Sequence, residues 1–181
     1  MDKTQTIALF GGSFDPPHIG HEKIVKALLD LEYIDKVIVM PTFLNPFKSK
    51  SHASAKLRFK WLNQIFEKNT DVIVSEYEVK QNKKIPTIET VEYLLTKYSK
   101  IFLIIGADNL ISLKKWHNYD KLKVKVSFLI VHRNNIEIPK SFSKLKIEEN
   151  ISSSELRKNI NSLKLPKSCS QDISKYYQRI L

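Results

Sequence analysis

The chain has 181 residues, 42% of them hydrophobic, which suffices for one substantial core and predicts a single domain over residues 1–181. No apolar run approaches the roughly 20 residues of a membrane helix, no secretory signal opens the chain, and one cysteine excludes an intrachain disulfide, so we expect a soluble, cytoplasmic protein without membrane contact. The net charge of +11 suits an anionic partner, but its lysines are scattered along every segment, so we expect no nucleic-acid partner.

Short apolar runs in chain order predict strands at residues 6–10, 36–40, 71–77, 101–105 and 126–131, with a weaker edge strand at 144–149. Amphipathic segments between them predict helices at residues 21–31, 53–68, 87–98, 108–122, 153–163 and 170–180. This alternation is typical of an α/β fold, a Rossmann-like doubly wound parallel sheet with helices on both faces. Ligands of such sheets bind beyond the carboxyl ends of the strands, so function is expected in the loops after them.

The loop after the first strand has the sequence "GGSFDPPHIGH". Gly11 and Gly12 are predicted to let the backbone turn sharply and approach a phosphate. The Gly-Lys-Ser/Thr of a P-loop is missing and so is GxGxxG, which disfavours kinase-type ATP hydrolysis and NAD-dependent hydride transfer. The next helix is predicted to begin near His18 and His21, where unpaired N–H groups favour an anion, and Gly20 leaves room for a phosphate.

Three interpretations of His18 and His21 compete. A metal site is disfavoured, because zinc needs three or four ligands and no further His or Cys stands at ligand spacing. Taken singly, each histidine would more often be a helix cap or a buried structural residue. Together with the glycines and the helix start, the pair favours phosphate contact, in which the imidazoles donate hydrogen bonds to phosphate oxygens.

Two further candidates follow the fourth predicted strand. Asp108, with Gly106 before it, can accept hydrogen bonds from ribose hydroxyls, although a helix N-cap explains it equally well. Trp116 has polar neighbours that make a partly exposed ring plausible, whereas Trp61, in an amphipathic helix, is expected in the core.

The segment "ISSSELR" reads as a helix start, in which Ser152 or Ser153 caps the helix. Arg157 stands close behind, and a guanidinium near a helix N-terminus is suited to phosphate. Lys48 and Arg133 end or follow strands on the expected ligand edge and could contact phosphates, although a solvated charge is the ordinary state of such a residue.

These motifs resemble the HxGH nucleotidyltransferase superfamily, and the fuller form of the first motif resembles the bacterial nicotinate-mononucleotide adenylyltransferases. "FLIIGADNL" with Trp116 is similar to the family's IIGxDxL…W segment, and "ISSSELR" to its ISSTxIR motif. The sister phosphopantetheine adenylyltransferases usually carry a threonine in place of His18. The three motifs stand in the family's order and cover nearly the whole chain.

The resemblance implies transfer of AMP from ATP to nicotinate mononucleotide, giving deamido-NAD and pyrophosphate in NAD biosynthesis. Mg²⁺ would be carried with ATP, without metal ligands from the protein. The implied catalytic residues are His18, His21 and Arg157. The implied ATP-binding residues are Gly11, Gly12, Ser13, Phe14, His18, His21, Gly106, Asp108, Ser153, Ser154 and Arg157. The implied mononucleotide-binding residues are Lys48, Thr87, Trp116 and Arg133.

The chain departs from the family pattern in two loops. In "PTFLNPFK", Thr42 and Phe47 replace the family's asparagine and histidine, so any phosphate contact of that histidine is absent or supplied by Lys48. In "KIPT", Pro86 replaces the usual tyrosine before Thr87, which changes the shape expected of the acceptor pocket.

Two alternatives remain open at this point. The first is adenylyl transfer to another phosphorylated acceptor, such as phosphopantetheine or nicotinamide mononucleotide, since the preference for the acid over the amide rests on the resemblance alone. The second is a noncatalytic nucleotide- or RNA-binding module. The residues are compatible with a monomer or a homodimer.

Overall fold

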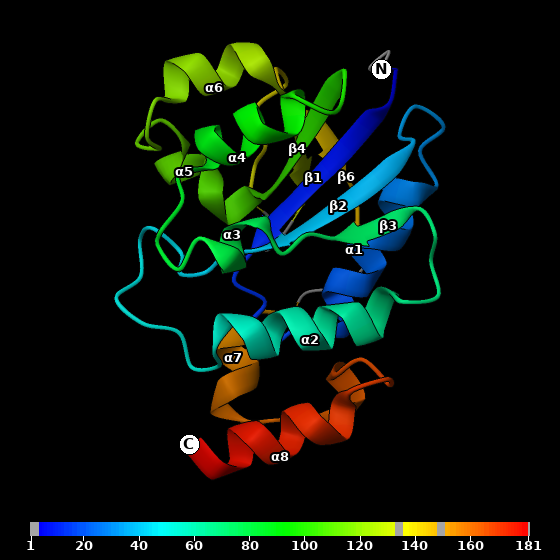
Figure 1. The fold of residues 1–181 in the computed structure, drawn as a ribbon, viewed down its shortest axis with the longest axis vertical. Helices are drawn as coiled ribbons and strands as arrows, with labels where there is room; N and C mark the ends of the chain where they lie inside the picture. The colour runs from blue at the N-terminus through cyan, green and yellow to red at the C-terminus, as the bar shows by residue number, and fades with distance from the viewer. Residues whose placement is uncertain (1–3, 133–135, 148–150, 181) are drawn as a thin grey trace.

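The computed structural model describes residues 4–132, 136–147 and 151–180. Its described strands are all parallel and form one sheet in the order β3-β2-β1-β4-β5-β6 (Figure 1). The strands are β1 (Thr6–Gly12), β2 (Lys36–Pro41), β3 (Val72–Val74), β4 (Lys100–Gly106), β5 (Ser127–Val131) and β6 (Ser143–Leu145). The strand order reverses between β1 and β4, and this switch point is where such sheets bind ligands.

Helices connect the strands and follow the last of them. They are α1 (Ile19–Leu29), α2 (Ala55–Phe66), α3 (Tyr77–Lys80), α4 (Thr87–Leu95), η1 (Ala107–Asn109), α5 (Leu110–Leu113), α6 (Tyr119–Lys125), α7 (Ser153–Lys158), η2 (Ser162–Lys164) and α8 (Ser170–Ile180). No helix in the described ranges is long and apolar enough to span a membrane.

Alternating side chains of the strands build a core on each face of the sheet. On one face, Ile7 and Leu9 pack with the helices α4, α5 and α6, and on the other, Ala8 and Phe10 pack with α1 and α2. A third cluster joins the outer side of α2 to α7 and α8, which lie beyond α2 in Figure 1. Trp61 lies in this cluster, so its predicted core position is confirmed.

The predicted fold class is confirmed, and two predicted elements were wrong in extent. The predicted strand 71–77 pairs with β2 only over Val72–Val74, and the Ser75 side chain then accepts a hydrogen bond from the N–H of Tyr77, where α3 begins. The predicted helix 108–122 is divided into η1, α5 and α6, and Asn118, in a left-handed conformation with φ of 53°, separates α6 from the residues before it.

Two more predicted elements differ at their ends. The predicted helix 153–163 stops at Lys158, because Asn159 is extended and the Asn161 side chain caps η2. The weaker edge strand is β6, which begins one residue before the predicted start and ends at Leu145. Residues 148 and 149 of that prediction lie outside the described residues.

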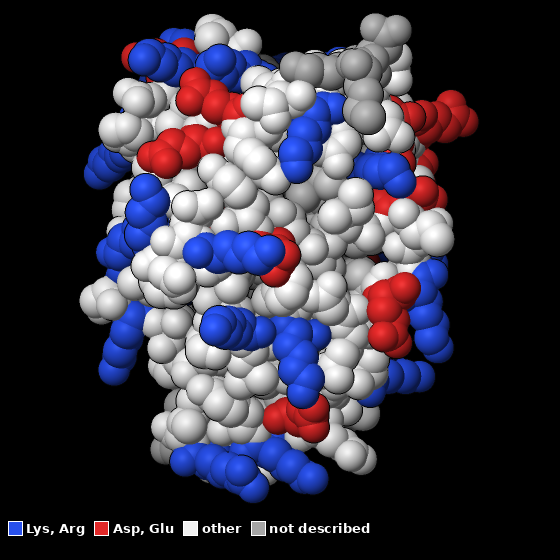
Figure 2. All heavy atoms as spheres, viewed as in Figure 1, with Lys and Arg blue, Asp and Glu red and all other residues white. Residues whose placement is uncertain are grey.

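The basic side chains on the face shown in Figure 2 are spread over the whole surface, with acidic side chains and uncharged areas among them. On this face they form no continuous stripe along one element, in agreement with the scatter of lysines along the sequence.

Candidate functional site

A cavity of about 390 Å³ lies at the carboxyl ends of β1 and β4. Its wall contains most of the residues singled out by sequence: Gly11, Gly12, Ser13, Phe14, His21, Lys48, Thr87, Gly106, Asp108, Trp116 and Ser153. His18, Ser154 and Arg157 are absent from the lining, although all three lie close to residues that form it. Arg133 lies outside the described residues, so its predicted role stays a prediction.

The loop after β1 turns later than the sequence predicted. Gly11 and Gly12 are the last two residues of β1, and no described glycine has a positive φ. Phe14 makes the turn instead, with φ of 49°. A Cβ on Gly12 would stand 3.2 Å from the Phe14 ring, so a larger residue there would need that ring to move by a few tenths of an ångström. The prediction that the glycines themselves make the turn was therefore wrong.

His18 and His21 form a capping pair at the start of α1. His18 is the N-cap, and its N–H donates to Nδ1 of His21 over 3.1 Å. The two rings stack with their centroids 3.6 Å apart. Because Nδ1 of His21 accepts, a neutral His21 carries its proton on Nε2 and is a donor there. His21 lines the cavity and His18, 1% exposed, lies behind it, so one imidazole rather than two forms the cavity wall.

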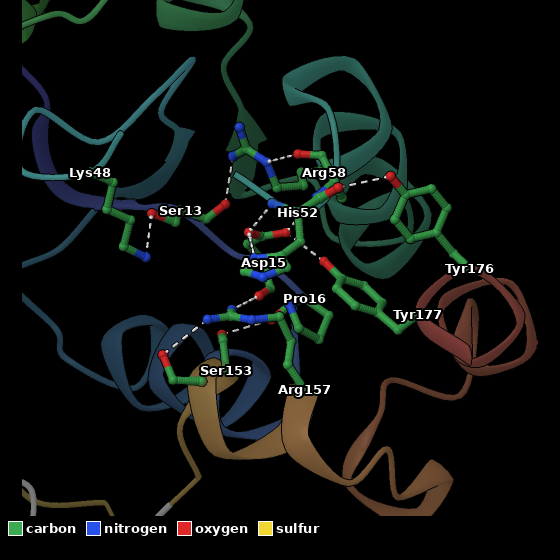
Figure 3. A network of polar contacts seen from close by, with 12 residues as sticks. Ser13, Asp15, Pro16, Lys48, His52, Arg58, Ser153, Arg157, Tyr176 and Tyr177 are labelled. Atoms are coloured by element: carbon green, nitrogen blue, oxygen red, sulfur yellow. Dashed lines mark hydrogen bonds and ion pairs between the residues drawn. The ribbon is translucent and has the colours of Figure 1, made fainter. Parts of the chain in front are cut away.

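Asp15 is the centre of a buried polar network (Figure 3). Its carboxylate accepts hydrogen bonds from the N–H groups of His52 and Ala53, each over 2.9 Å, and from the Tyr177 hydroxyl. Burial alone would raise the pKa of Asp15, but these hydrogen bonds and the charge of Arg58 outweigh it and hold the pKa below its usual value. The loop that precedes His18 is thereby tied to α8 at the far end of the chain.

Arg58 fixes the same loop from the side of α2. Its guanidinium is buried and donates to the carbonyl oxygens of Ser13, Thr42 and Phe43, while Nε donates to that of Ala53. Each of the three side-chain nitrogens thus donates to a backbone carbonyl, and the charge joins the loops after β1 and β2. Arg58 is therefore a structural residue of the site, and its guanidinium has no bidentate pair of N–H donors available for a phosphate.

Helix α7 is bound to the loop after β1 through two side chains, as Figure 3 shows. The Ser153 hydroxyl donates to the carbonyl oxygen of Pro16 over 2.8 Å. Arg157 donates through Nη1 to the carbonyl oxygen of Asp15 and through Nη2 to the Ser154 hydroxyl over 3.1 Å. The guanidinium is therefore oriented by two acceptors at the edge of the cavity.

Lys48 brings a further positive charge to this end of the cavity. Its Nζ lies 3.4 Å from the Ser13 hydroxyl. Partial burial and the neighbouring charges of Arg157 and Arg58 lower the pKa of Lys48, although Asp15 opposes them. Cations that repel one another in the absence of a ligand favour binding of a polyanion such as a triphosphate.

The other part of the wall comes from α3, α4 and the turn before α6, and contains Thr87, Thr90, Glu78 and Trp116. Glu78 is 5% exposed, and its Oε1 accepts a hydrogen bond of 2.6 Å from the Thr90 hydroxyl. Burial raises the pKa of Glu78 to about 7, against the opposing effect of that hydrogen bond.

Three buried side-chain atoms of the cavity wall have no hydrogen-bond partner among the described residues. They are Oγ1 of Thr42, Oε2 of Glu78 and Nε1 of Trp116. Native proteins rarely leave such atoms unsatisfied, and a ligand that fills the cavity is a natural partner for them.

Gly106 and Asp108 lie together in the wall after β4. A Cβ on Gly106 would stand 2.4 Å from Oδ1 of Asp108, so the glycine is what lets this carboxylate fold back over the strand end. The N-cap residue of η1 is Gly106, and no described side chain caps this helix. The alternative that Asp108 is a helix N-cap was therefore wrong.

Sequence reasoning missed four residues of the site: Asp15, Arg58, Glu78 and Tyr177. Asp15 stands inside the quoted motif and Arg58 is one of four arginines in the chain, so both carried a signal. Glu78 and Tyr177 carried none, because each gains its role from a partner on another element.

Comparison with known proteins agrees with this geometry. The model of the cytidylyltransferase-like family matches residues 9–159. A Sulfurimonas denitrificans protein named "Probable nicotinate-nucleotide adenylyltransferase" is 56% identical over 173 residues, which cover 96% of this chain and 95% of that protein. A Campylobacter jejuni protein of the same name is 44% identical over 176 residues, covering 96% and 97% of the two chains.

Solved structures show the same fold. The Plasmodium falciparum nicotinic acid mononucleotide adenylyltransferase complexed with NaAD superposes with a TM-score of 0.78 at 22% identity, covering 96% of this chain and 98% of that one. Its complex with APC gives a TM-score of 0.73, with the same coverage. By its family match and its relatives, the chain belongs to the nicotinate-nucleotide adenylyltransferases of the cytidylyltransferase-like family.

Proposed function

We propose that this protein transfers AMP from ATP to nicotinate mononucleotide, giving deamido-NAD and pyrophosphate. The observation that carries the proposal is the cavity itself, which joins two different environments. The end near α1 and α7 has His21, the helix N-terminus, Lys48 and Arg157, and suits phosphates. The end near α3 and α4 has an aromatic ring and neutral hydroxyls, and suits a nucleoside base or ring.

In the reaction, an oxygen of the mononucleotide phosphate attacks the α-phosphorus of ATP in line. The bond from that phosphorus to the bridging oxygen of the β-phosphate breaks, and pyrophosphate leaves with the electron pair. No residue becomes a covalent nucleophile, so catalysis rests on positioning and on charge stabilisation.

Different residues of the cavity have different roles in this reaction. Nε2–H of His21 donates to an oxygen of the reacting phosphate and stabilises the charge that develops there, while His18 holds the ring of His21 in place. Ser153, Ser154 and Arg157 bind the leaving pyrophosphate, and Gly106 and Asp108 bind the ATP ribose. Lys48 binds the phosphate of the mononucleotide, and Thr87 and Trp116 bind its ring.

Magnesium enters in this proposal as part of the substrate MgATP. The described residues contain no group of three His, Cys, Asp or Glu side chains that could hold a metal ion. Asp15, in the loop that precedes His18, already accepts three hydrogen bonds. In this proposal, phosphate oxygens and water would hold the magnesium ion.

The experiment is an acceptor panel with MgATP, in which nicotinate mononucleotide, nicotinamide mononucleotide and phosphopantetheine are compared by pyrophosphate release and product mass. We expect the highest kcat/KM with nicotinate mononucleotide and a product with the mass of deamido-NAD. Preference for phosphopantetheine, or ATP binding without turnover of any acceptor, would overturn the proposal.

A further inference from the structure

Glu78 is a buried acid in the cavity wall that the proposed mechanism leaves unused. Its Oε1 is fixed by the Thr90 hydroxyl at 2.6 Å, so Oε2 keeps one orientation. Oε2 is buried, has no hydrogen-bond partner among the described residues, and belongs to a side chain that lines the cavity. An acid held in this way has one oxygen committed to the protein and one available to a ligand.

Burial and the hydrogen bond from Thr90, rather than a neighbouring cation, set the pKa of Glu78. Titratable or charged side chains lie on the elements around Glu78 and in the cavity wall. On the elements they are Glu76 before α3, Tyr77 and Lys80 on α3, Lys56, Arg58 and Lys60 on α2, Lys36 on β2, and Glu89, Glu92 and Tyr93 on α4. In the wall they are Asp15, His21, Lys48, Asp108 and His117. None of them determines the pKa of Glu78, which burial raises to about 7 against the hydrogen bond from Thr90. The neutral carboxylic acid is thus readily reached near neutral pH.

The acceptor adds a negative charge to this environment. Nicotinate mononucleotide carries a ring carboxylate in addition to its phosphate, and the lysine of the described cavity wall, Lys48, belongs to the phosphate end with Ser13. A ring carboxylate at the end formed by Glu78, Thr87 and Trp116 must therefore be held by neutral donors. A neutral Glu78 is such a donor, whereas an ionised Glu78 would repel it.

We propose that Glu78 is a specificity-determining residue of the acceptor pocket, whose Oε2–H donates a hydrogen bond to the ring carboxylate of nicotinate mononucleotide. This inference rests on the proposed function. Above neutral pH the free protein holds Glu78 partly as carboxylate, so binding of the acceptor takes up a proton from solvent. Nicotinamide mononucleotide has an uncharged amide at this position, so the hydrogen bond from Glu78 should contribute less to its binding.

The test is isothermal titration calorimetry of nicotinate mononucleotide at pH 7.5–8, in two buffers of different ionisation enthalpy. Proton uptake is compared among the wild-type protein, Glu78→Gln, Glu78→Leu and the control Glu89→Gln, which changes an exposed acid on α4. We expect uptake in the wild type and the control, and reduced uptake in Glu78→Gln. Glu78→Gln should keep nearly the wild-type affinity, because its amide still accepts from Thr90 and donates to the ligand.

Glu78→Leu removes the donor and should weaken binding of nicotinate mononucleotide about 10- to 100-fold, with a smaller effect on nicotinamide mononucleotide and none on ATP. Equal proton uptake in the wild type and Glu78→Gln, or an affinity lost equally in Glu78→Gln and Glu78→Leu, would overturn the role of Glu78 while leaving turnover intact. If the wild type neither binds nor converts nicotinate mononucleotide, the proposed function fails and the role of Glu78 fails with it.

Discussion

His21 combines a structural and a chemical contact in one side chain. Its Nδ1 accepts from the N–H of His18 and so caps α1, while its ring lines the cavity with Nε2 as the donor. Replacement by alanine should lower kcat about 10²–10³-fold, roughly 3–4 kcal/mol, because a preorganised donor to the reacting phosphate is lost. Loss of the cap should cost a further ~1 kcal/mol of unfolding free energy.

The measurement is steady-state kinetics at saturating ATP, together with chemical denaturation to confirm that the variant is folded. His132→Ala changes an exposed histidine absent from the cavity lining and should leave kcat unchanged. A folded His21→Ala protein with near-normal kcat would remove His21 from the chemistry.

Trp116 offers the acceptor both a ring face and an indole N–H. Its Nε1 is buried in the cavity wall without a described partner. Trp116→Ala should raise KM for the mononucleotide far more than KM for ATP, because stacking area is lost. Trp116→Phe keeps most of the stacking and should show the smaller increase that loss of one hydrogen bond explains. Equal increases in both KM values would place Trp116 outside the acceptor pocket.

At the scale of elements, α7 brings Arg157 to the loop after β1. Because Arg157 donates to the Asp15 carbonyl and the Ser154 hydroxyl, it is oriented before ATP binds. Arg157→Ala should raise KM for ATP about tenfold or more, since charge-assisted hydrogen bonds to phosphate are strong. Lys158→Ala, on the same helix and exposed, is the matched control. Unchanged ATP kinetics in Arg157→Ala would exclude its pyrophosphate role.

Helix α8 stabilises the same loop from the other side, through the hydrogen bond from Tyr177 to Asp15. The folded-state pKa of Asp15 lies below its ordinary value of 3.8, so this stabilisation is present above that value and is lost as the pH falls through the lowered pKa. Tyr177→Phe should therefore reduce the unfolding free energy by about 1.5–3 kcal/mol at pH 7, and by less at acidic pH.

Denaturant unfolding from pH 7 to pH 3 measures this difference. Tyr176→Phe, which removes a neighbouring hydroxyl that donates to the uncharged carbonyl of His52, should give a smaller change without that pH dependence. A Tyr177→Phe effect that is constant with pH would show that the hydroxyl does not stabilise the Asp15 carboxylate.

For the whole molecule, the sequence predicted those features of the fold that depend on residues close together in the chain. The strand runs and the motif order gave the parallel sheet, the position of its ligand edge and most of the cavity wall, because strand ends and helix starts follow from neighbouring residues. The exact turn at Phe14 and the helix break at Asn118 were missed, since left-handed residues other than glycine leave little signal.

Long-range pairs were beyond prediction from one sequence. Tyr177 and Asp15 are 162 residues apart, and only the packing of α8 against α2 brings the hydroxyl to the carboxylate. Glu78 follows the predicted strand 71–77, which is shorter in the structure, and its carboxyl accepts a hydrogen bond from Thr90 in α4. Both residues support the site from elements that carry no recognisable motif.

The central claim, that this cavity joins ATP to nicotinate mononucleotide, is tested most directly by following both products in one reaction. Wild-type protein and His21→Ala are each given MgATP and nicotinate mononucleotide, and pyrophosphate and dinucleotide are quantified over time. The account predicts one pyrophosphate for each deamido-NAD in the wild type, and the same stoichiometry at a 10²–10³-fold lower rate in His21→Ala. Release of phosphate and ADP without a dinucleotide, or equal rates in the two proteins, would contradict it.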